Sequence, residues 1–252
     1  MVSGANLIYD TFRKFGLKCH VGTTNKKSKT EAMFFPAARS DQGPADRSEF
    51  NMGGGKVHFV EQFQYLGSIV HESLDDAFDV DNRIKAAGAA FGALKTIFGC
   101  KTVPLKSKGA LYDSAVLELL LHGSEAWTIK KALLRRLKNF HNACVRRMCR
   151  INRWHSREYR IRQTCLEKRL SLRPMDTVLR QKQLRWAGHV ARMDGSRFPR
   201  KLISGWVANP RRRGRPQQSY GHSLANALKE AGIDKANWIS IAQDRRLWRS
   251  MI

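Results

Sequence analysis

The sequence has 252 residues, of which 46 are Lys or Arg and 21 are Asp or Glu, so its formal net charge is +25. This length is enough for one large domain or two small ones, and a hydrophobic content of 42% argues against a chain that is disordered throughout. The charge argues against an inert structural protein and against a carrier of a small acidic ligand. It favours a polyanionic partner, either a nucleic acid, an anionic membrane or an acidic protein.

Targeting signals and cysteines indicate the compartment. The first ten residues have neither the basic start nor the apolar run of a signal peptide. No apolar stretch approaches the length of a membrane span. The five cysteines are irregularly spaced, which is not typical of a disulfide framework. We therefore expect an intracellular protein with reduced thiols, located in the nucleus or the cytoplasm, and neither secreted nor bound to a membrane.

The N-terminal segment, residues 1–78, is predicted to combine one helix with short strands. The helix is expected over residues 6–15, and Gly16 ends it. Strands are expected over residues 30–35, 56–60 and 63–70. The last of these is interrupted near Gly67, and the glycines at 53–55 indicate a hairpin. We expect these strands to form a small antiparallel sheet.

From residue 79 onward the apolar period changes from two residues to about 3.6, which predicts helices. Residues 81–99 carry an apolar stripe, with the charged Arg83, Lys85 and Lys95 expected elsewhere on the surface. The members of this stripe are Ile84, Ala87, Phe91, Leu94 and Phe98. Residues 130–151 carry a second stripe, made of Leu133, Leu137, Phe140, Cys144, Met148 and Ile151.

The C-terminal part of the chain is also predicted to be helical. Helices are expected near residues 156–168, 174–193, 219–231 and 235–250. Residues 197–216 are rich in Arg, Pro and Gly and are expected to form a mostly irregular connection. The predicted fold class is therefore mainly α with a small N-terminal antiparallel β element (α+β). Its predicted domains are residues 1–78, 79–152 and 153–252.

The excess positive charge lies entirely after residue 80. Residues 1–80 contain 9 Lys or Arg and 10 Asp or Glu, whereas residues 81–252 contain 37 and 11. Solvated surfaces usually mix both signs, so basic helix faces of this kind are better explained as phosphate contacts. The candidate nucleic-acid-binding residues are Lys95, Lys130, Lys131, Arg135, Arg136, Lys138, Arg146, Arg147, Arg150, Arg180, Arg185, Arg211, Arg212, Arg213 and Arg215.

Tryptophans are interleaved with these arginines. They are Trp154, Trp186, Trp206, Trp238 and Trp248. Aromatic side chains among arginines can stack on unpaired bases. Tryptophans on helices are more often part of the core, so we favour core packing for each of them, above all for Trp186.

Asp75, Asp76 and Asp79 form the dense acidic group of the sequence. A metal-dependent nuclease or polymerase could use such carboxylates to hold two cations. In the other interpretation they lie at a helix N-terminus, where Asp side chains accept hydrogen bonds from free N–H groups and stabilise the helix by about 0.5–2 kcal/mol. We favour the helix N-terminus, because a helical pattern follows at once and the sequence has no second acidic cluster.

His141, Cys144, Cys149 and His155 can be considered as zinc ligands. Their spacing, H-x2-C-x4-C-x5-H, matches none of the common zinc patterns. Cys144 also falls on the apolar stripe of the helix expected over residues 130–151, and a free Cys is most often a small buried apolar residue. We therefore favour core packing over a zinc site. The sequence also contains no phosphate-binding glycine loop and no hydrolase motif.

Several segments, taken in order, resemble the reverse transcriptases of non-LTR, LINE-type retrotransposons. Residues 15–18 with 29–33 are similar to the palm segment that follows the catalytic aspartates in that family. Residues 57–68 look like the hairpin that closes the palm, which is the primer-grip region. The primer-grip-like residues are Phe63, Tyr65, Leu66, Gly67 and Ser68.

The later segments follow the same family in the expected order. Residues 82–94, 111–127 and 137–147 resemble successive parts of the thumb. Residues 185–193, 214–216 and 244–249 are similar to the C-terminal region of these elements. Each segment alone is a weak signal, and the ordered set is a strong one.

The resemblance implies the end of a palm (1–78), a helical thumb (79–152) and a basic C-terminal region (153–252). In this family the catalytic aspartates lie in an F/Y-x-Asp-Asp turn upstream of a segment like residues 6–15, and the sequence begins after that turn. The resemblance therefore implies a chain that binds primer and template but is not an enzyme by itself. Mg²⁺ is expected only for the full-length polymerase.

The expected partners are RNA, DNA or an RNA–DNA hybrid, with no membrane, no cofactor and no small-molecule substrate. One alternative is a stand-alone basic protein that binds nucleic acid or chromatin. Another is a metal-dependent nuclease or polymerase that uses Asp75 and Asp76. Changing Arg135, Arg136, Arg146 and Arg147 to Glu is predicted to weaken nucleic-acid binding far more than changing the two aspartates.

Overall fold

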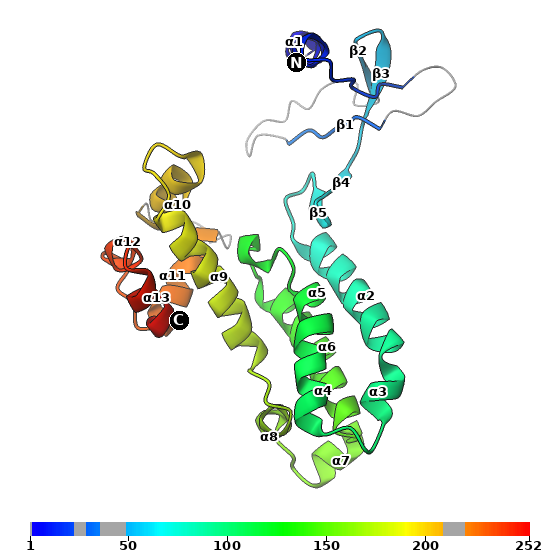
Figure 1. The fold of residues 1–252 in the computed structure, drawn as a ribbon, viewed down its shortest axis with the longest axis vertical. Helices are drawn as coiled ribbons and strands as arrows, with labels where there is room; N and C mark the ends of the chain where they lie inside the picture. The colour runs from blue at the N-terminus through cyan, green and yellow to red at the C-terminus, as the bar shows by residue number, and fades with distance from the viewer. Residues whose placement is uncertain (1, 23–28, 36–48, 209–219) are drawn as a thin grey trace. The chain divides into compact units, whose positions relative to one another are not determined.

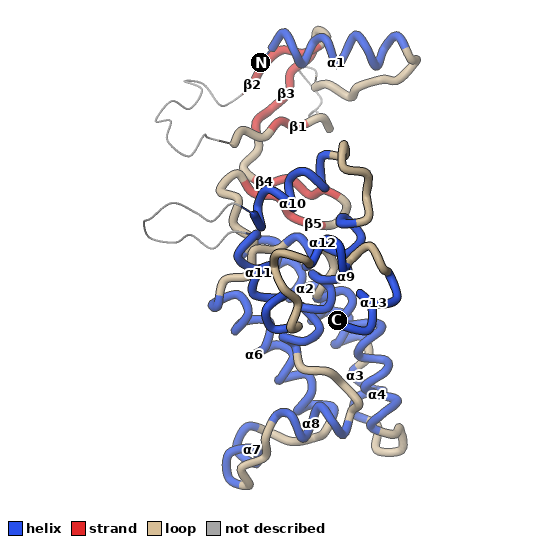
Figure 2. Tube along the Cα trace, turned by 90° about the vertical axis from the view of Figure 1, so that its left-hand side faces the viewer, coloured by secondary structure: helices blue, strands red, loops and turns tan. Residues whose placement is uncertain are grey.

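The computed structural model describes residues 2–22, 29–35, 49–208 and 220–252, and most of them are helical (Figure 1). The strands of the described residues all lie between residues 31 and 71, and Figure 2 draws them in red. These features confirm the prediction of a mainly α fold with a small β element. The chain separates into two compact units, residues 1–79 and 80–252.

The first unit contains a helix, α1 (Val2–Lys14), and a β-hairpin formed by β2 (Glu49–Met52) and β3 (Gly55–Phe59). The two loop residues of the hairpin, Gly53 and Gly54, have φ angles of +58° and +81°. Positive φ at both loop positions is type I′ geometry, which glycine adopts without strain. The glycine run is thus a hairpin turn, as the sequence predicts.

α1 packs against this hairpin turn. The backbone N–H of Gly53 donates a hydrogen bond to Asn6 Oδ1 at 3.0 Å. A Cβ atom at Gly53 would lie 2.3 Å from the ring of Tyr9, so only glycine lets the helix approach this closely. The same glycine therefore serves both the turn and the packing of α1.

Two features of the sheet differ from the prediction. β1 (Glu31–Ala32) pairs with β3 in parallel, so the sheet is mixed and not purely antiparallel. Parallel pairing joins segments that are distant in sequence, and no local pattern indicates it. β2 is also a strand that was not predicted, because its alternation of polar and apolar residues extends over only four positions.

The segment expected as one strand over residues 63–70 is a second hairpin. It consists of β4 (Gln62–Tyr65) and β5 (Ser68–His71), joined by Leu66 and Gly67. Both loop residues have positive φ, +49° for Leu66 and +86° for Gly67, so the interruption lies where the glycine predicted it. The N–H of Ile69 donates to Asp79 Oδ1 at 2.9 Å.

The second unit is built from helices throughout its described residues. In chain order the helices are α2 (Ala77–Ala93), which starts at the end of the first unit, α3 (Lys95–Gly99), α4 (Leu105–Tyr112), α5 (Glu118–Leu120), α6 (Lys131–Met148), α7 (Arg153–Glu158), α8 (Gln163–Arg169), α9 (Met175–Ala191), α10 (Phe198–Ala208), α11 (Tyr220–Glu230), α12 (Trp238–Ile241) and α13 (Arg245–Met251). A π-helical segment, Asp113–Leu117, and a 3₁₀ turn, Ser124–Ala126, lie between α4 and α6.

The predicted apolar stripes face the core of this unit. On α2 and α3, the rings of Phe91 and Phe98 are buried and stack at 4.7 Å. On α6, Leu137 and Cys144 are buried, as expected for the second stripe. The stripe over residues 81–99 spans two helices instead of one.

Arg83 does not lie on the surface, as predicted, but is buried. Its exposed fraction is 7%, and its guanidinium Nη2 lies 2.9 Å from His122 Nδ1. Arg83 precedes the buried Ala87 by four residues, so both lie on the same face of α2. The periodicity that identified the stripe also places this arginine on it.

Three C-terminal predictions need correction. The helix expected over residues 235–250 is two helices, α12 and α13, and Asp244 caps the start of the second. The helix expected over residues 156–168 is two helices, α7 and α8, separated where Arg160 adopts a φ of +48°. The connection expected to be irregular over residues 197–216 contains α10. Pro199 is the second residue of that helix, and an N–H at this position would make no intrahelical hydrogen bond. The proline is therefore compatible with the start of a helix. Residues 209–216 of this segment lie outside the described residues.

Gly109 allows α4 to pack directly on the segment that ends α8. A Cβ atom at this position would lie 1.9 Å from the carbonyl oxygen of Leu170, a buried residue. Gly109→Ala is therefore expected to lower the free energy of unfolding by about 1–3 kcal/mol, because backbone must move to make room.

The matched control is Gly92→Ala on α2, where a Cβ atom meets nothing within 4 Å. This change should raise the free energy of unfolding by about 0.5–1 kcal/mol, because alanine favours the helix. Urea denaturation followed by circular dichroism measures both. Equal effects from the two substitutions would contradict the close contact at Gly109.

Candidate nucleic-acid interface

Among the described helices, α6 carries the largest number of Lys and Arg residues, and these residues occupy one side of it. We call Lys131, Arg135, Arg136, Lys138, Arg146 and Arg147 the α6 basic surface. With about 100° per residue, these six side chains cover about half of the helix circumference, and the buried Leu133, Leu137 and Cys144 occupy the opposite side. The helix is therefore anchored by one side and presents positive charge on the other.

Two members of the α6 basic surface form ion pairs within the chain. Arg136 pairs with Asp81, and Lys138 Nζ lies 2.7 Å from Asp176 Oδ2. All four side chains are 40–47% exposed, and ion pairs at such exposure contribute only about 0.2–1 kcal/mol. These cations can therefore exchange their carboxylate partners for phosphate at little cost.

The α6 basic surface continues into a small pocket shared with α7. The pocket has a volume of about 260 Å³ and is lined by Asn139, Asn142, Arg146, Arg153, Ser156 and Arg157. The pKa of Arg146 lies below its ordinary value, first because of burial and then because of the positive charge of Arg153. Like charges are thus held close together beside neutral hydrogen-bonding groups.

Exposed aromatic rings lie close in sequence to this pocket, with Trp154 on α7 and Tyr159 directly after it. Trp154 is 60% exposed and Tyr159 is 66% exposed, and each ring packs against His155. The prediction of core packing for Trp154 is wrong, because α7 is a single short helix with no buried residue. Rings exposed next to arginines are suited to stacking on unpaired bases.

The other described tryptophans belong to the core, as predicted. Trp238 and Trp248 are each 1% exposed, and Trp186 packs against the same cluster. The side chain of Trp206 lies outside the described residues.

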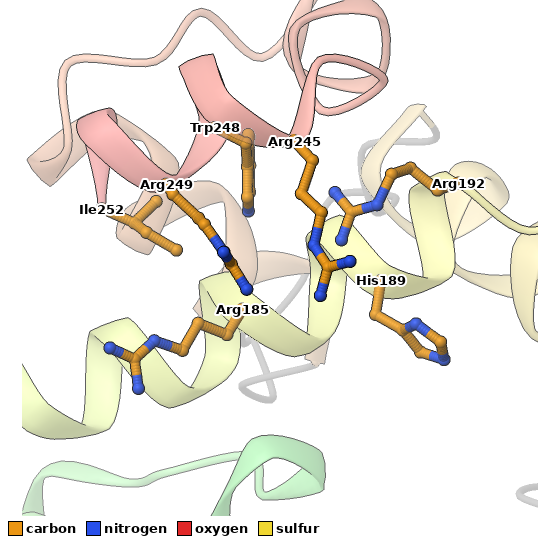
Figure 3. Close-up of a pocket in the computed structure, with 7 residues that line it drawn as sticks. All are labelled: Arg185, His189, Arg192, Arg245, Trp248, Arg249 and Ile252. Atoms are coloured by element: carbon orange, nitrogen blue, oxygen red, sulfur yellow. The ribbon is translucent and has the colours of Figure 1, made fainter.

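A second concentration of positive charge lies between α9 and α13. The pocket has a volume of about 500 Å³ and is lined by Arg185, His189, Arg192, Arg245, Trp248, Arg249 and Ile252; we call it the arginine pocket. Figure 3 shows the side chains of Arg245 and Arg249 extending from α13 toward α9, which carries Arg185; Arg192 is the residue that follows α9.

Trp248 joins the two helices that line the arginine pocket. Its indole Nε1 donates to the carbonyl oxygen of Leu184 on α9 at 3.0 Å. A Cβ atom at Gly188 would lie 2.2 Å from the same nitrogen, so glycine leaves the space that the indole ring fills. α13 starts at the cap residue Asp244, whose carboxylate accepts from the N–H groups of Arg246 and Leu247. The tryptophan and the cap together fix α13 on α9.

The charges in the arginine pocket repel one another. The pKa of Arg192 lies below its ordinary value, first because of burial and then because of the positive charges of Arg245 and Arg249. Arg192 is held in place by a hydrogen bond from Nη1 to the carbonyl oxygen of Ala242 at 2.8 Å. The described lining of the pocket contains no Asp or Glu side chain that would balance these charges.

Of the predicted binding residues, only Arg185 belongs to this pocket. Arg192, Arg245 and Arg249 were missed, although each helix carries a visible signal. Arg185, His189 and Arg192 follow at i, i+4 and i+7, and Arg245 and Arg249 at i and i+4, so each group shares one helix face.

The remaining predicted binding residues are dispersed. Lys95 is the first residue of α3 and is exposed, and Lys130 immediately precedes α6. Arg150 follows α6 with a φ of +58°, and Arg180 on α9 forms an ion pair with Glu230 at 2.8 Å. Arg211, Arg212, Arg213 and Arg215 lie outside the described residues. Among the predicted residues, the structure thus brings together only those of the α6 basic surface. Their role in binding remains a prediction.

The primer-grip-like residues lie on the β4–β5 hairpin of the first unit. Phe63 and Tyr65 belong to β4, Leu66 and Gly67 form the loop, and Ser68 begins β5. Tyr65 and Leu66 are 62% and 79% exposed, so the hairpin presents apolar groups at its tip. Such a tip can contact a strand end but offers no charge of its own.

The acidic group takes part in local hydrogen bonds. Asp75 Oδ1 accepts from the N–H of Ala77 at 3.0 Å, at the start of α2, and Asp79 is buried and accepts from Ile69. These contacts agree with the helix N-terminus favoured for this segment. No three His, Cys, Asp or Glu side chains come together as a metal site within the part of the chain that the structure describes.

The residues considered for zinc have other partners. His141 is buried, with Nδ1 3.0 Å from the hydroxyl of Tyr112 and Nε2 3.4 Å from Glu167. Cys144 is buried as well, so the prediction that it packs in the core is confirmed. His155 lies on α7 among the exposed rings.

The cysteines are expected to differ in reactivity. Burial raises the pKa of the Cys144 thiol to about 12. Hydrogen bonds from the side chain and backbone of Thr102 lower the pKa of Cys100 below its ordinary value. Only the thiolate reacts, so at pH 8 iodoacetamide should label Cys100 at least about a thousandfold faster than Cys144.

Mass spectrometry of the labelled protein measures this difference. Cys144 should be modified only after denaturation, which serves as the positive control. Labelling of Cys144 in the folded protein at the rate of Cys100 would contradict its burial.

No helix among the described residues is long and apolar enough to cross a membrane.

A transposon-derived protein of Caenorhabditis elegans, itself uncharacterized, is 30% identical to this chain over 198 residues, which cover 77% of this chain and 70% of that protein. The chain belongs to this family of transposon-derived proteins. No family model matches it. No solved structure matches it either. The basic helices of this transposon-derived chain, α6 above all, are its candidate site.

Proposed function

We propose that this chain is the C-terminal part of the RNA-directed DNA polymerase of a non-LTR retrotransposon, and that it grips primer and template without polymerising by itself. Its membership of a transposon-derived family supports an origin in a mobile element. The ordered segments that resemble palm, thumb and C-terminal region support a reverse transcriptase as that origin.

The observation that carries the proposal is the distribution of charge. The first unit holds 9 Lys or Arg and 10 Asp or Glu, and the second unit holds 37 and 11. On α6 this excess lies opposite a buried apolar stripe, so it faces solvent and not the core. Nucleic acids are the ligands with one negative charge per nucleotide along a strand, and they match an extended basic surface of this kind.

Each part of the molecule has a role in this proposal. α6 and its pocket with α7 contact the backbone of the primer–template duplex, and the exposed rings of Trp154 and Tyr159 receive unpaired bases beside it. The exposed hairpin tip at Tyr65 and Leu66 guides the end of the primer. Catalysis, with its Mg²⁺, belongs to the palm of the full-length polymerase.

Fluorescence anisotropy tests the proposal with three probes: a primed RNA–DNA hybrid, duplex DNA and single-stranded RNA. If about six phosphates are neutralised, the affinity should fall about a thousandfold between 50 and 200 mM salt. We expect the hybrid to bind best. A shallow salt dependence, or no binding by the folded protein, would overturn the proposed function.

A further inference from the structure

The arginine pocket places four guanidinium groups around one space, from two helices that are distant in sequence. The pKa of Arg192 is lowered in part by Arg245 and Arg249, so the positive charges are close enough to repel. Repulsion of this kind is relieved when an anion enters the space between the charges. The pocket is therefore built for an anionic ligand.

The size of the pocket indicates more than one anionic group. Its volume of about 500 Å³ lies in the range of small-molecule sites, and one phosphate ion would leave most of it empty. A guanidinium group binds phosphate oxygens through two parallel N–H donors, so four such groups can hold two phosphates in a bidentate manner. Neighbouring phosphates along a strand supply that pair.

Trp248, the indole of the lining, offers no surface for a base. Its side chain is 1% exposed and its Nε1 donates to the carbonyl oxygen of Leu184. A buried indole ring whose N–H is already bonded cannot serve as a stacking platform. The exposed ring of His189 also lines the pocket, but stacking on a ring does not distinguish one base from another, so binding here is expected to depend on phosphate and not on base sequence.

The helix α13 and one arginine of the pocket are also held in place before a ligand arrives. The carboxylate of Asp244 caps α13, and Arg192 donates to the carbonyl oxygen of Ala242. A side chain held in place, as Arg192 is, loses little conformational freedom when it binds. We infer that the arginine pocket binds two adjacent phosphate groups of a nucleic-acid strand, independently of base sequence; this assignment rests on the proposed function for its ligand.

The test compares two charge-matched double variants of the full chain. Arg245→Gln with Arg249→Gln removes two charges from the arginine pocket. Arg246→Gln with Lys229→Gln removes two charges from exposed residues of α13 and α11 that do not line it. Anisotropy with single-stranded poly-U and mixed-sequence RNA measures affinity across salt, and titration calorimetry with inorganic pyrophosphate measures binding of two linked phosphates alone.

We expect the pocket variant to bind RNA about tenfold more weakly at 150 mM salt. The plot of log K against log salt should become less steep by about 1.4, which is the value for the loss of two phosphate contacts with a single strand. The control variant should lose less than threefold. Poly-U and mixed-sequence RNA should bind equally, and pyrophosphate should bind the wild type and the control but not the pocket variant.

The outcomes separate this inference from the proposed function. If RNA binds the wild type and both variants alike, the proposed function stands and the pocket inference fails. If pyrophosphate binds in the pocket but no RNA binds the wild type, the ligand is a free polyphosphate, and both the strand assignment and the proposed function are overturned. A preference for one base sequence that disappears in the pocket variant would also overturn the inference, because it assigns binding that is independent of base sequence.

Discussion

Changing Arg135 and Arg147 to Glu is expected to weaken binding of a primed RNA–DNA hybrid about a hundredfold at 150 mM salt. Both side chains are exposed on the α6 basic surface. Losing two phosphate contacts costs about 25-fold through counterion release, and the two introduced carboxylates add repulsion. These two residues are better suited to the test than Arg136, which pairs with Asp81, or Arg146, which is partly buried.

Two controls accompany this double reversal. Lys229→Glu with Lys235→Glu makes the same change in net charge on exposed residues near the end of α11, and it should weaken binding less than fivefold. Asp75→Asn with Asp76→Asn should change binding less than threefold. Anisotropy gives the affinities, and thermal melting by circular dichroism confirms that each variant is folded. Equal loss in both charge reversals would show that net charge, and not α6, determines binding.

The helices could be predicted from the sequence wherever one side of them is buried. The stripe from Leu133 to Met148 repeats at helical spacing, and α6 follows it closely. The same logic failed at Arg83, because a charged residue on a buried face is invisible to an analysis of apolar positions. It failed again at α10, where arginine and proline indicated irregular structure although Pro199 lies in the first turn.

The sheet was harder to predict for a different reason. The loop glycines, Gly53 and Gly67, marked both hairpins because positive φ is a local requirement. The parallel pairing of Glu31 with His58 is a contact between distant segments, and nothing in either short strand specifies its partner.

The two basic sites differ in how far the sequence could predict them. The α6 basic surface is contiguous, so its residues could be named from one stretch of chain. The arginine pocket requires α13 to lie on α9, and that contact depends on Trp248 filling the space beside Gly188. Both segments, residues 185–193 and 244–249, stood out through their resemblance to retrotransposon sequences, but only the fold brings them together.

Trp248→Ala is expected to have the largest effect on stability, lowering the free energy of unfolding by about 3–5 kcal/mol. The indole is 1% exposed, lies 6.3 Å from the ring of Trp238 between centroids, and donates to the carbonyl oxygen of Leu184. Truncation leaves a cavity between α9 and α13 and removes that hydrogen bond. For a unit of this size, the midpoint of thermal unfolding should fall by about 10 °C.

Two further variants distinguish packing from a general effect of losing tryptophan. Trp248→Phe keeps most of the ring but removes the N–H donor, so it should cost about 1–2 kcal/mol. Trp154→Ala removes a ring that is 60% exposed and should cost less than about 0.5 kcal/mol. Because Trp248 also positions Arg245 and Arg249, Trp248→Ala should reduce the salt dependence of RNA binding at a temperature where the protein is still folded. If Trp248→Ala and Trp154→Ala melted alike, α13 would not be held on α9 by this residue, and the arginine pocket would lose its structural basis.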